Sequence, residues 1–149
     1  MIIVSESQRR NRLNGLVPTL SLYSGVYFKV LAKCRREGYL ENSDVFVLTK
    51  RGLLGSNDLT TYDEPIPGAP GSLRLTGEEI ERSRRKNLRM LKQAFASKRY
   101  GRVYVNVGRE YIALLGGIEK VSPVSIEYAM GRGLGPKAQH MREWIHANA

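Results

Sequence analysis

The sequence has little cysteine and no long hydrophobic run. Cys34 is the single cysteine in 149 residues, so the chain has no partner for an internal disulfide. Apolar stretches such as Met1–Val4 fall far short of the roughly 18 residues that a membrane-spanning helix needs. The N-terminus shows no charged region followed by an apolar stretch and a cleavage site, so we expect no secretory signal. These absences favour a cytoplasmic protein without a membrane partner.

Residues that commonly hold metals or carry out catalysis are also scarce. His140 and His146 are the two histidines, and their spacing places them on different faces of a helix. With one cysteine they form no zinc motif. The chain contains neither a Walker A sequence nor a Rossmann fingerprint. We therefore predict no metal site and no cofactor, and the sequence alone leaves open whether the protein is an enzyme.

Acidic residues are outnumbered, with 14 Asp and Glu against 24 Lys and Arg, which gives a net charge of +10. The excess is concentrated between Arg82 and Arg109, where no acidic residue interrupts the basic ones. Such a segment repels itself, and a nucleic acid offsets that cost. The alternative is a solvated helix face. The residues predicted to contact nucleic acid are Arg82, Arg84, Arg85, Lys86, Arg89 and Lys92.

Apolar patterning predicts alternating strands and helices. Strands are expected at 1–5, 44–49, 102–107 and, weakened by Pro123, 121–126. Helices are expected at 27–34, 76–99, 110–115 and 136–146. Cys34 falls on the apolar side of the first helix, which predicts a buried thiol. The pattern indicates an α/β protein with three layers, in which helices flank a mainly parallel sheet of about four strands. We find no second domain, so residues 1–149 are taken as one.

Polar residues follow the three most apolar strands. The carboxyl ends of parallel strands meet at one edge of a sheet, where ligands bind in such folds. Hydroxyl, amide and cationic groups there suit a phosphate or a carboxylate, although ordinary strand-end turns have the same composition. Tyr62 and Asp63 would close one side of the pocket. The other predicted ligand-binding residues are Ser5, Ser7, Lys50, Asn106, Gly108 and Arg109.

The segment Gly131–Lys137 precedes the last expected helix and contains three glycines. Glycines allow a close approach of the backbone to an anion, and a helix N-terminus favours negative charge. A purely structural role for these glycines explains the pattern equally well.

Several short motifs span most of the chain, and they are Ile2–Ser7, Leu22–Gly25 with Phe28-Lys29, Val47–Leu54, Thr61–Asp63, and Val105–Gly108 with Tyr111. Together they resemble a poorly characterised prokaryotic α/β domain family. They also resemble, more loosely, the YaaA-type proteins and the internal domain of archaeosine synthase, a tRNA-modifying enzyme. The resemblance implies an α/β fold and a link to nucleic acid and modified bases. Glu6 stands where the family usually has cysteine, which places any thiol chemistry in doubt.

These observations lead to three hypotheses. The first is a nucleic-acid- or nucleotide-binding α/β domain linked to tRNA base modification, with RNA favoured over DNA. The second is a small-molecule or nucleotide-processing enzyme whose site lies at the strand ends and uses Asp63 and Lys50. The third is a subunit whose basic face binds an acidic protein partner.

Overall fold

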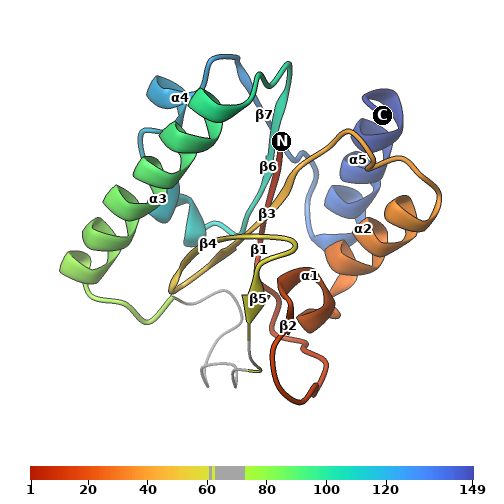
Figure 1. Ribbon diagram of the computed structural model, residues 1–149, viewed down its shortest axis with the longest axis horizontal. Coiled ribbons are helices and arrows are strands. Elements are labelled where there is room, and N and C mark those ends of the chain that lie inside the picture. Colours follow the sequence, from red (N-terminus) through yellow and green to blue (C-terminus); the bar gives the residue numbers. More distant parts are fainter. Residues whose placement is uncertain (61, 63–72) are drawn as a thin grey trace.

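A five-stranded sheet lies between two layers of helices (Figure 1). The computed structural model describes residues 1–60, 62 and 73–149. The strand order is β4-β3-β1-β6-β7, and all neighbours are parallel except the antiparallel pair β3–β4. The strands are β1 (Ile2–Ser5), β3 (Val45–Thr49), β4 (Gly52–Gly55), β6 (Val103–Asn106) and β7 (Ile126–Tyr128).

Strand β1 is the centre of the sheet because its residues are apolar on both faces. Ile2, Ile3 and Val4 are fully buried. Ile3 pairs with Phe46 of β3 on one side and with Val105 of β6 on the other. A strand covered by helices on both faces needs this continuous apolar pattern rather than an alternating one.

Helices cover both faces of the sheet (Figure 1). One face is covered by α2 (Val26–Arg36) and α5 (Leu134–Ala147). The other is covered by α3 (Gly77–Ser97), the 3-10 helix η1 (Tyr111–Leu115) and α4 (Ile118–Val121). Each layer buries its own hydrophobic cluster against the sheet. The three-layer α/β architecture predicted from the sequence is confirmed.

Helix α3 begins where the sequence predicts it. The Thr76 hydroxyl accepts a hydrogen bond from the Glu79 amide, and the Glu79 carboxylate accepts one from the Thr76 amide. This reciprocal capping box satisfies two amides that the helix leaves unpaired. Leu91 is fully buried, and Ile80, Leu88 and Phe95 pack against the same core cluster. The predicted inward face of the helix is therefore confirmed.

The sheet differs from the prediction at its two edges. The expected strand at 121–126 begins only at Ile126, because Val121 ends α4 and the Ser122 hydroxyl forms a turn with Val124. The sequence also gave no indication of β4, which folds back on β3 after a tight turn. A separate small sheet pairs β2 (Val17–Pro18) with β5 (Leu59–Thr60), next to α1 (Thr19–Leu22).

All three long helices begin at the carboxyl end of the parallel strands (Figure 1). Helices α2 and α3 each follow one parallel strand and lead to the start of the next, and α5 follows β7, so all three begin where a parallel strand ends. The N-termini of α2 and α5 consequently lie near the ends of β1 and β6. No helix in the described part of the chain is long and apolar enough to span a membrane.

Candidate functional site

A pocket of about 630 Å³ lies at the carboxyl ends of β1 and β6. Its wall continues onto the N-terminal turns of α2 and α5. This volume is within the range of small-molecule sites, which is about 300–1,000 Å³. The lining residues are Ser5–Arg9, Ser24–Lys29, Asn106–Gly108, Gly133, Leu134 and Lys137.

Two helices direct their N-terminal ends at this pocket. Gly25 and Gly133 are the N-cap residues of α2 and α5, and neither helix has a side-chain cap. Backbone amides in the first turns therefore remain unpaired within the described part of the chain. An uncapped helix N-terminus attracts anions through these amides and through the helix dipole. The free amides belong to Val26, Tyr27, Leu134 and Gly135.

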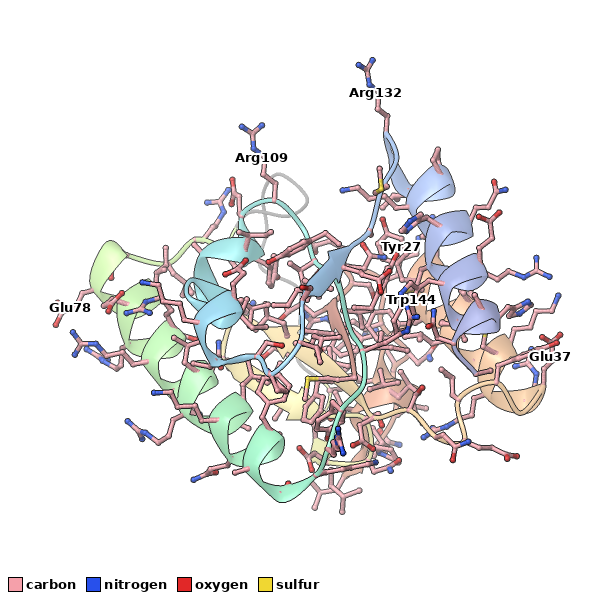
Figure 2. All side chains as sticks on the ribbon, turned by 90° about the horizontal axis from the view of Figure 1, so that it is seen from above. Tyr27, Glu37, Glu78, Arg109, Arg132 and Trp144 are labelled. Atoms are coloured by element: carbon pink, nitrogen blue, oxygen red, sulfur yellow. The ribbon has the colours of Figure 1, made fainter. Side chains whose placement is uncertain are left out.

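The charge of the lining is positive. Arg9, Lys29 and Lys137 line the pocket, and none of them forms an ion pair within the described residues. Figure 2 shows Arg109 and Arg132, which follow β6 and β7, projecting from one side of the molecule. The pocket thus combines unpaired cations with unpaired amides, which is the chemistry that holds a phosphate or a carboxylate.

The pocket floor is formed by the last residues of two neighbouring strands. The Ser5 hydroxyl accepts a hydrogen bond of 3.0 Å from the Gly108 amide, which joins the loops that follow β1 and β6. Asn106 is 2% exposed, and its amide nitrogen lies 3.6 Å from Met141 Sδ. Burial raises the pKa of the Tyr27 hydroxyl, and a hydrogen bond with the Asn106 side chain opposes that rise. Polar groups thus occupy the deepest part of the site.

Ser7 fixes the position of the α2 N-terminus. Its hydroxyl accepts a hydrogen bond of 3.3 Å from the Gly25 amide and donates one of 2.5 Å to the Arg9 carbonyl. A Cβ on Gly25 would lie 2.7 Å from Ser7 Cβ, a distance that real contacts do not reach. The serine and the glycine therefore allow the loop after β1 to pass directly against the helix.

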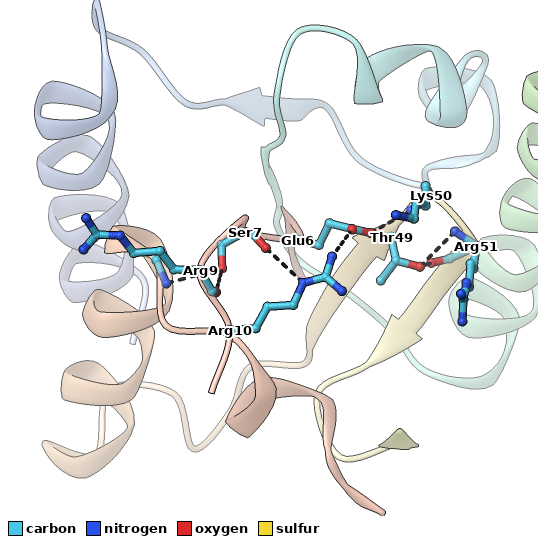
Figure 3. Close-up of polar contacts among 9 residues, drawn as sticks. Glu6, Ser7, Arg9, Arg10, Thr49, Lys50 and Arg51 are labelled. Atoms are coloured by element: carbon cyan, nitrogen blue, oxygen red, sulfur yellow. Dashed lines mark hydrogen bonds and ion pairs between the residues drawn. The ribbon is translucent and has the colours of Figure 1, made fainter. Parts of the chain in front are cut away.

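A buried ion pair separates this pocket from the next strand end. Glu6 and Arg10 meet at 2.7 Å, and their side chains are 6% and 3% exposed. The same Glu6 carboxylate accepts a hydrogen bond of 2.7 Å from the Lys50 amide. Figure 3 shows Arg9 on the side of α2 and α5, and Lys50 on the opposite side of Glu6. Glu6 thus joins the loops that follow β1 and β3.

The structure brings only part of the predicted strand-end cluster together. Ser5, Ser7, Asn106 and Gly108 line one pocket, and their proposed role as ligand-binding residues stays a prediction. Lys50 lies in a separate hollow of about 80 Å³ with Thr49 and Arg51, because the Glu6–Arg10 pair stands between them.

Three further predicted site residues do not line the pocket. Arg109 follows Gly108 directly but is exposed and projects away from the molecule (Figure 2). Tyr62 lies near the Arg12 guanidinium, 5.7 Å from ring centroid to Cζ, and does not line the pocket. Asp63 lies outside the described residues.

The basic face of α3 contains two kinds of cation. Arg84 and Arg85 both bind the Glu81 carboxylate, and Arg84 also donates a 3.0 Å hydrogen bond to the Gly116 carbonyl. These arginines lower the pKa of Glu81 to about 2. Arg82 lies 3.6 Å from Glu78. The other residues predicted to contact nucleic acid are Lys86, Arg89 and Lys92. Within the described chain they form no ion pair.

Sequence reasoning missed the contribution of the α2 N-terminus and left that of the α5 N-terminus open. Arg9, Lys29 and Lys137 were not predicted as site residues, although each lies next to a predicted strand end or helix start. The glycine segment before α5 was the available signal, since Gly131 and Gly133 have positive φ angles of 126° and 84° and Gly133 lines the pocket. Metal-ligating residues do not gather in groups of three or more in the described part of the chain.

Comparisons with known proteins do not assign this chain to a family. No protein-family model, curated protein or solved structure matches it.

Proposed function

We propose that this protein binds nucleic acid or a nucleotide, and that the strand-end pocket holds a phosphate-bearing nucleotide unit. The observation that carries this proposal is the meeting of two uncapped helix N-termini in one pocket with Arg9, Lys29 and Lys137. Each helix end offers amide donors and a positive dipole, and each cation adds charge. A phosphate has more oxygen acceptors and more charge than a carboxylate, so it can use more of these groups.

The carboxylate content of the pocket supports binding of an anion. Glu6 carries the one carboxylate among the described lining residues, and Arg10 neutralises it at 2.7 Å. Among the described lining residues, negative charge on a ligand therefore meets no uncompensated negative charge. Of the two groups that the enzyme hypothesis uses, Lys50 lies in the separate hollow and Asp63 lies outside the described residues.

We further propose that Lys86, Arg89 and Lys92 on α3 contact the backbone of a longer nucleic acid. Cations without an acidic neighbour are the ones whose counterions a phosphate backbone releases. The preference for RNA over DNA, and the link to tRNA base modification, rest on the resemblance described above. The acidic-protein hypothesis makes a different prediction, namely that the same three residues bind a protein and not an RNA.

Binding measurements on matched variants test the proposal. The protein is titrated into a fluorescent single-stranded RNA and, separately, the four nucleoside monophosphates are titrated into the protein by calorimetry. Lys29→Ala/Lys137→Ala should weaken binding of the mononucleotides at least about tenfold, because charge-assisted contacts contribute about 1.5–3 kcal/mol each. The control is Lys33→Ala/Lys120→Ala, which removes the same charge away from the pocket. Equal losses in both double variants would refute the pocket as the binding site.

A further inference from the structure

We propose that the pocket receives a single nucleoside with its base innermost, that Asn106 reads the edge of the base, and that the phosphate stays at the mouth. This inference rests on the proposed function and goes beyond it, because it names the unit that is recognised and the residue that discriminates between bases. The unit is a free mononucleotide or one nucleotide turned out of an RNA strand.

The depth of each lining group sets the orientation of the ligand. Arg9 and Lys29 are exposed and Lys137 is half-buried, so the cations surround the mouth. Asn106 and Ser5 are buried at the strand ends, so neutral hydrogen-bonding groups form the floor. A charged phosphate is bound with least loss of hydration at the mouth, whereas an uncharged base loses less on entering the interior when its polar edge finds hydrogen-bonding partners there.

Asn106 has hydrogen-bonding capacity that the protein does not use fully. A primary amide offers two donors and an acceptor with two lone pairs. In the described residues the Asn106 side chain contacts the thioether of Met141, which is a weak acceptor, and shares a hydrogen bond with Tyr27. Asn87 provides a contrast, since it is equally buried but binds the Leu53 amide and the Leu114 carbonyl. Asn106 is therefore the buried amide with groups left for a ligand.

An amide is suited to the edge of a base. It places a donor and an acceptor side by side, which matches neighbouring acceptor and donor groups of a nucleobase, as in the pairing of Asn or Gln with adenine. Tyr27 and Asn106 line the same pocket, and the Asn106 side chain acts on the pKa of the Tyr27 hydroxyl, so the two groups are neighbours there.

The walls of the pocket suit the flat faces of a base. Leu134 is 64% exposed and Val26 is 37% exposed, and both line the pocket at the start of a helix. Phe28 and Val107 add buried apolar surface. These side chains offer apolar surface beside unpaired cations. A base can pack against that surface while its phosphate meets the cations.

Calorimetric titration of the wild-type protein tests this inference without any variant. The ligands are AMP, GMP, CMP, UMP, ribose 5-phosphate and inorganic phosphate. We expect at least one nucleotide to bind tenfold or more tightly than ribose 5-phosphate, and the four nucleotides to differ from one another. Equal affinity for the nucleotides and ribose 5-phosphate would overturn the inference and leave the anion site of the proposed function intact. Absence of binding by every nucleotide and by RNA would overturn both.

Two variants then test whether Asn106 is the residue that discriminates between bases. Asn106→Ala should reduce the differences between bases to less than about threefold while ribose 5-phosphate binds as before. Asn87→Ala is the control for loss of a buried amide, and its base ranking should remain that of the wild type. An unchanged ranking in Asn106→Ala overturns the role of this residue. Tyr27→Phe removes only a hydroxyl, and it should reduce the same differences if Asn106→Ala does not fold.

Competition distinguishes the two sources of the nucleotide. A single-stranded RNA of the preferred base, with and without a 5′-phosphate, is used to displace the preferred mononucleotide. Displacement at lower concentration by the RNA assigns the site to a nucleotide within a strand. Failure of both RNAs to displace the mononucleotide assigns it to the free compound. Displacement only by the 5′-phosphorylated RNA assigns it to a strand end.

Discussion

Replacing Glu6 by Gln should strongly destabilise the fold, because it removes the negative charge that faces the buried Arg10 guanidinium across the pair. The two side chains are 6% and 3% exposed and meet at 2.7 Å. Removing one partner of a buried ion pair costs about 3–5 kcal/mol. Arg10 also lies over the Tyr23 ring, 5.3 Å from its centroid, and its Nε donates a hydrogen bond of 3.4 Å to the Ser7 carbonyl, so favourable contacts remain. We therefore expect the lower end of that range, about 3 kcal/mol.

The measurements are urea unfolding, which gives the free energy, and thermal unfolding, which gives Tm, each followed by circular dichroism. A loss of about 3 kcal/mol corresponds to a fall in Tm of roughly 6–12 °C for a domain of this size. The control is Glu37→Gln, because Glu37 also pairs with a residue four positions away, Lys33. That pair is 3.9 Å apart and its side chains are 51% and 39% exposed. Its loss should cost less than about 0.5 kcal/mol.

A double variant, Glu6→Gln/Arg10→Met, tests the coupling between the two residues. The double variant leaves neither member of this pair facing a missing partner, so its loss should be smaller than the sum of the two single losses by at least about 1 kcal/mol. If Glu6→Gln costs no more than Glu37→Gln, or if the two single losses add, the account of a buried pair that joins the strand-end loops is wrong.

Other predictions concern the core, the sheet edge and α3. Cys34 is 1% exposed, so Ellman's reagent should react slowly with the native protein, and Cys34→Ala should cost about 1 kcal/mol. Hydrogen bonds from Tyr100 and Lys98 lower the pKa of Asp44 below its ordinary value of 3.8. Its stabilising effect should therefore be present above about pH 4 and disappear as the pH falls through the lowered pKa; urea titrations of wild type and Asp44→Asn should converge at acidic pH. Lys86, Arg89 and Lys92 are three cations on α3. Replacing all three by alanine should reduce the slope of log affinity for RNA against log salt concentration by at most about 2, and an unchanged slope would mean that this face of α3 is solvated and does not contact RNA.

Patterns of apolar residues were sufficient to predict most of the fold. The runs at Ile2–Ser5 and Val45–Thr49 are apolar on both faces, which occurs in strands covered on both sides. Helix α3 carries its own start signal at Thr76 and Glu79. Strand β4 was not predicted, because Gly52–Gly55 contains two glycines in four residues and pairs with the sheet only at its edge. Its conformation depends on β3 and on the Asn87 side chain rather than on local preference.

The candidate site was less predictable, because it depends on which loops meet. The meeting of Ser5, Asn106 and Gly108 followed from parallel strands, whose carboxyl ends share an edge. The position of Lys50 outside the pocket could not be predicted in this way. It is due to one ion pair between Glu6 and Arg10, and no local pattern marks two residues four apart as buried. The contribution of the helix N-termini required knowing that α2 and α5 are neighbours on the same face of the sheet.

The most direct test of the central claim is a titration of the ¹⁵N-labelled protein with a nucleoside monophosphate, followed by two-dimensional amide NMR. If the pocket binds the phosphate, the largest saturable shifts should occur at the unpaired amides in the first turns of α2 and α5, which belong to Val26, Tyr27, Leu134 and Gly135. Largest shifts on α3, or the absence of saturable shifts at these four amides, would contradict the account.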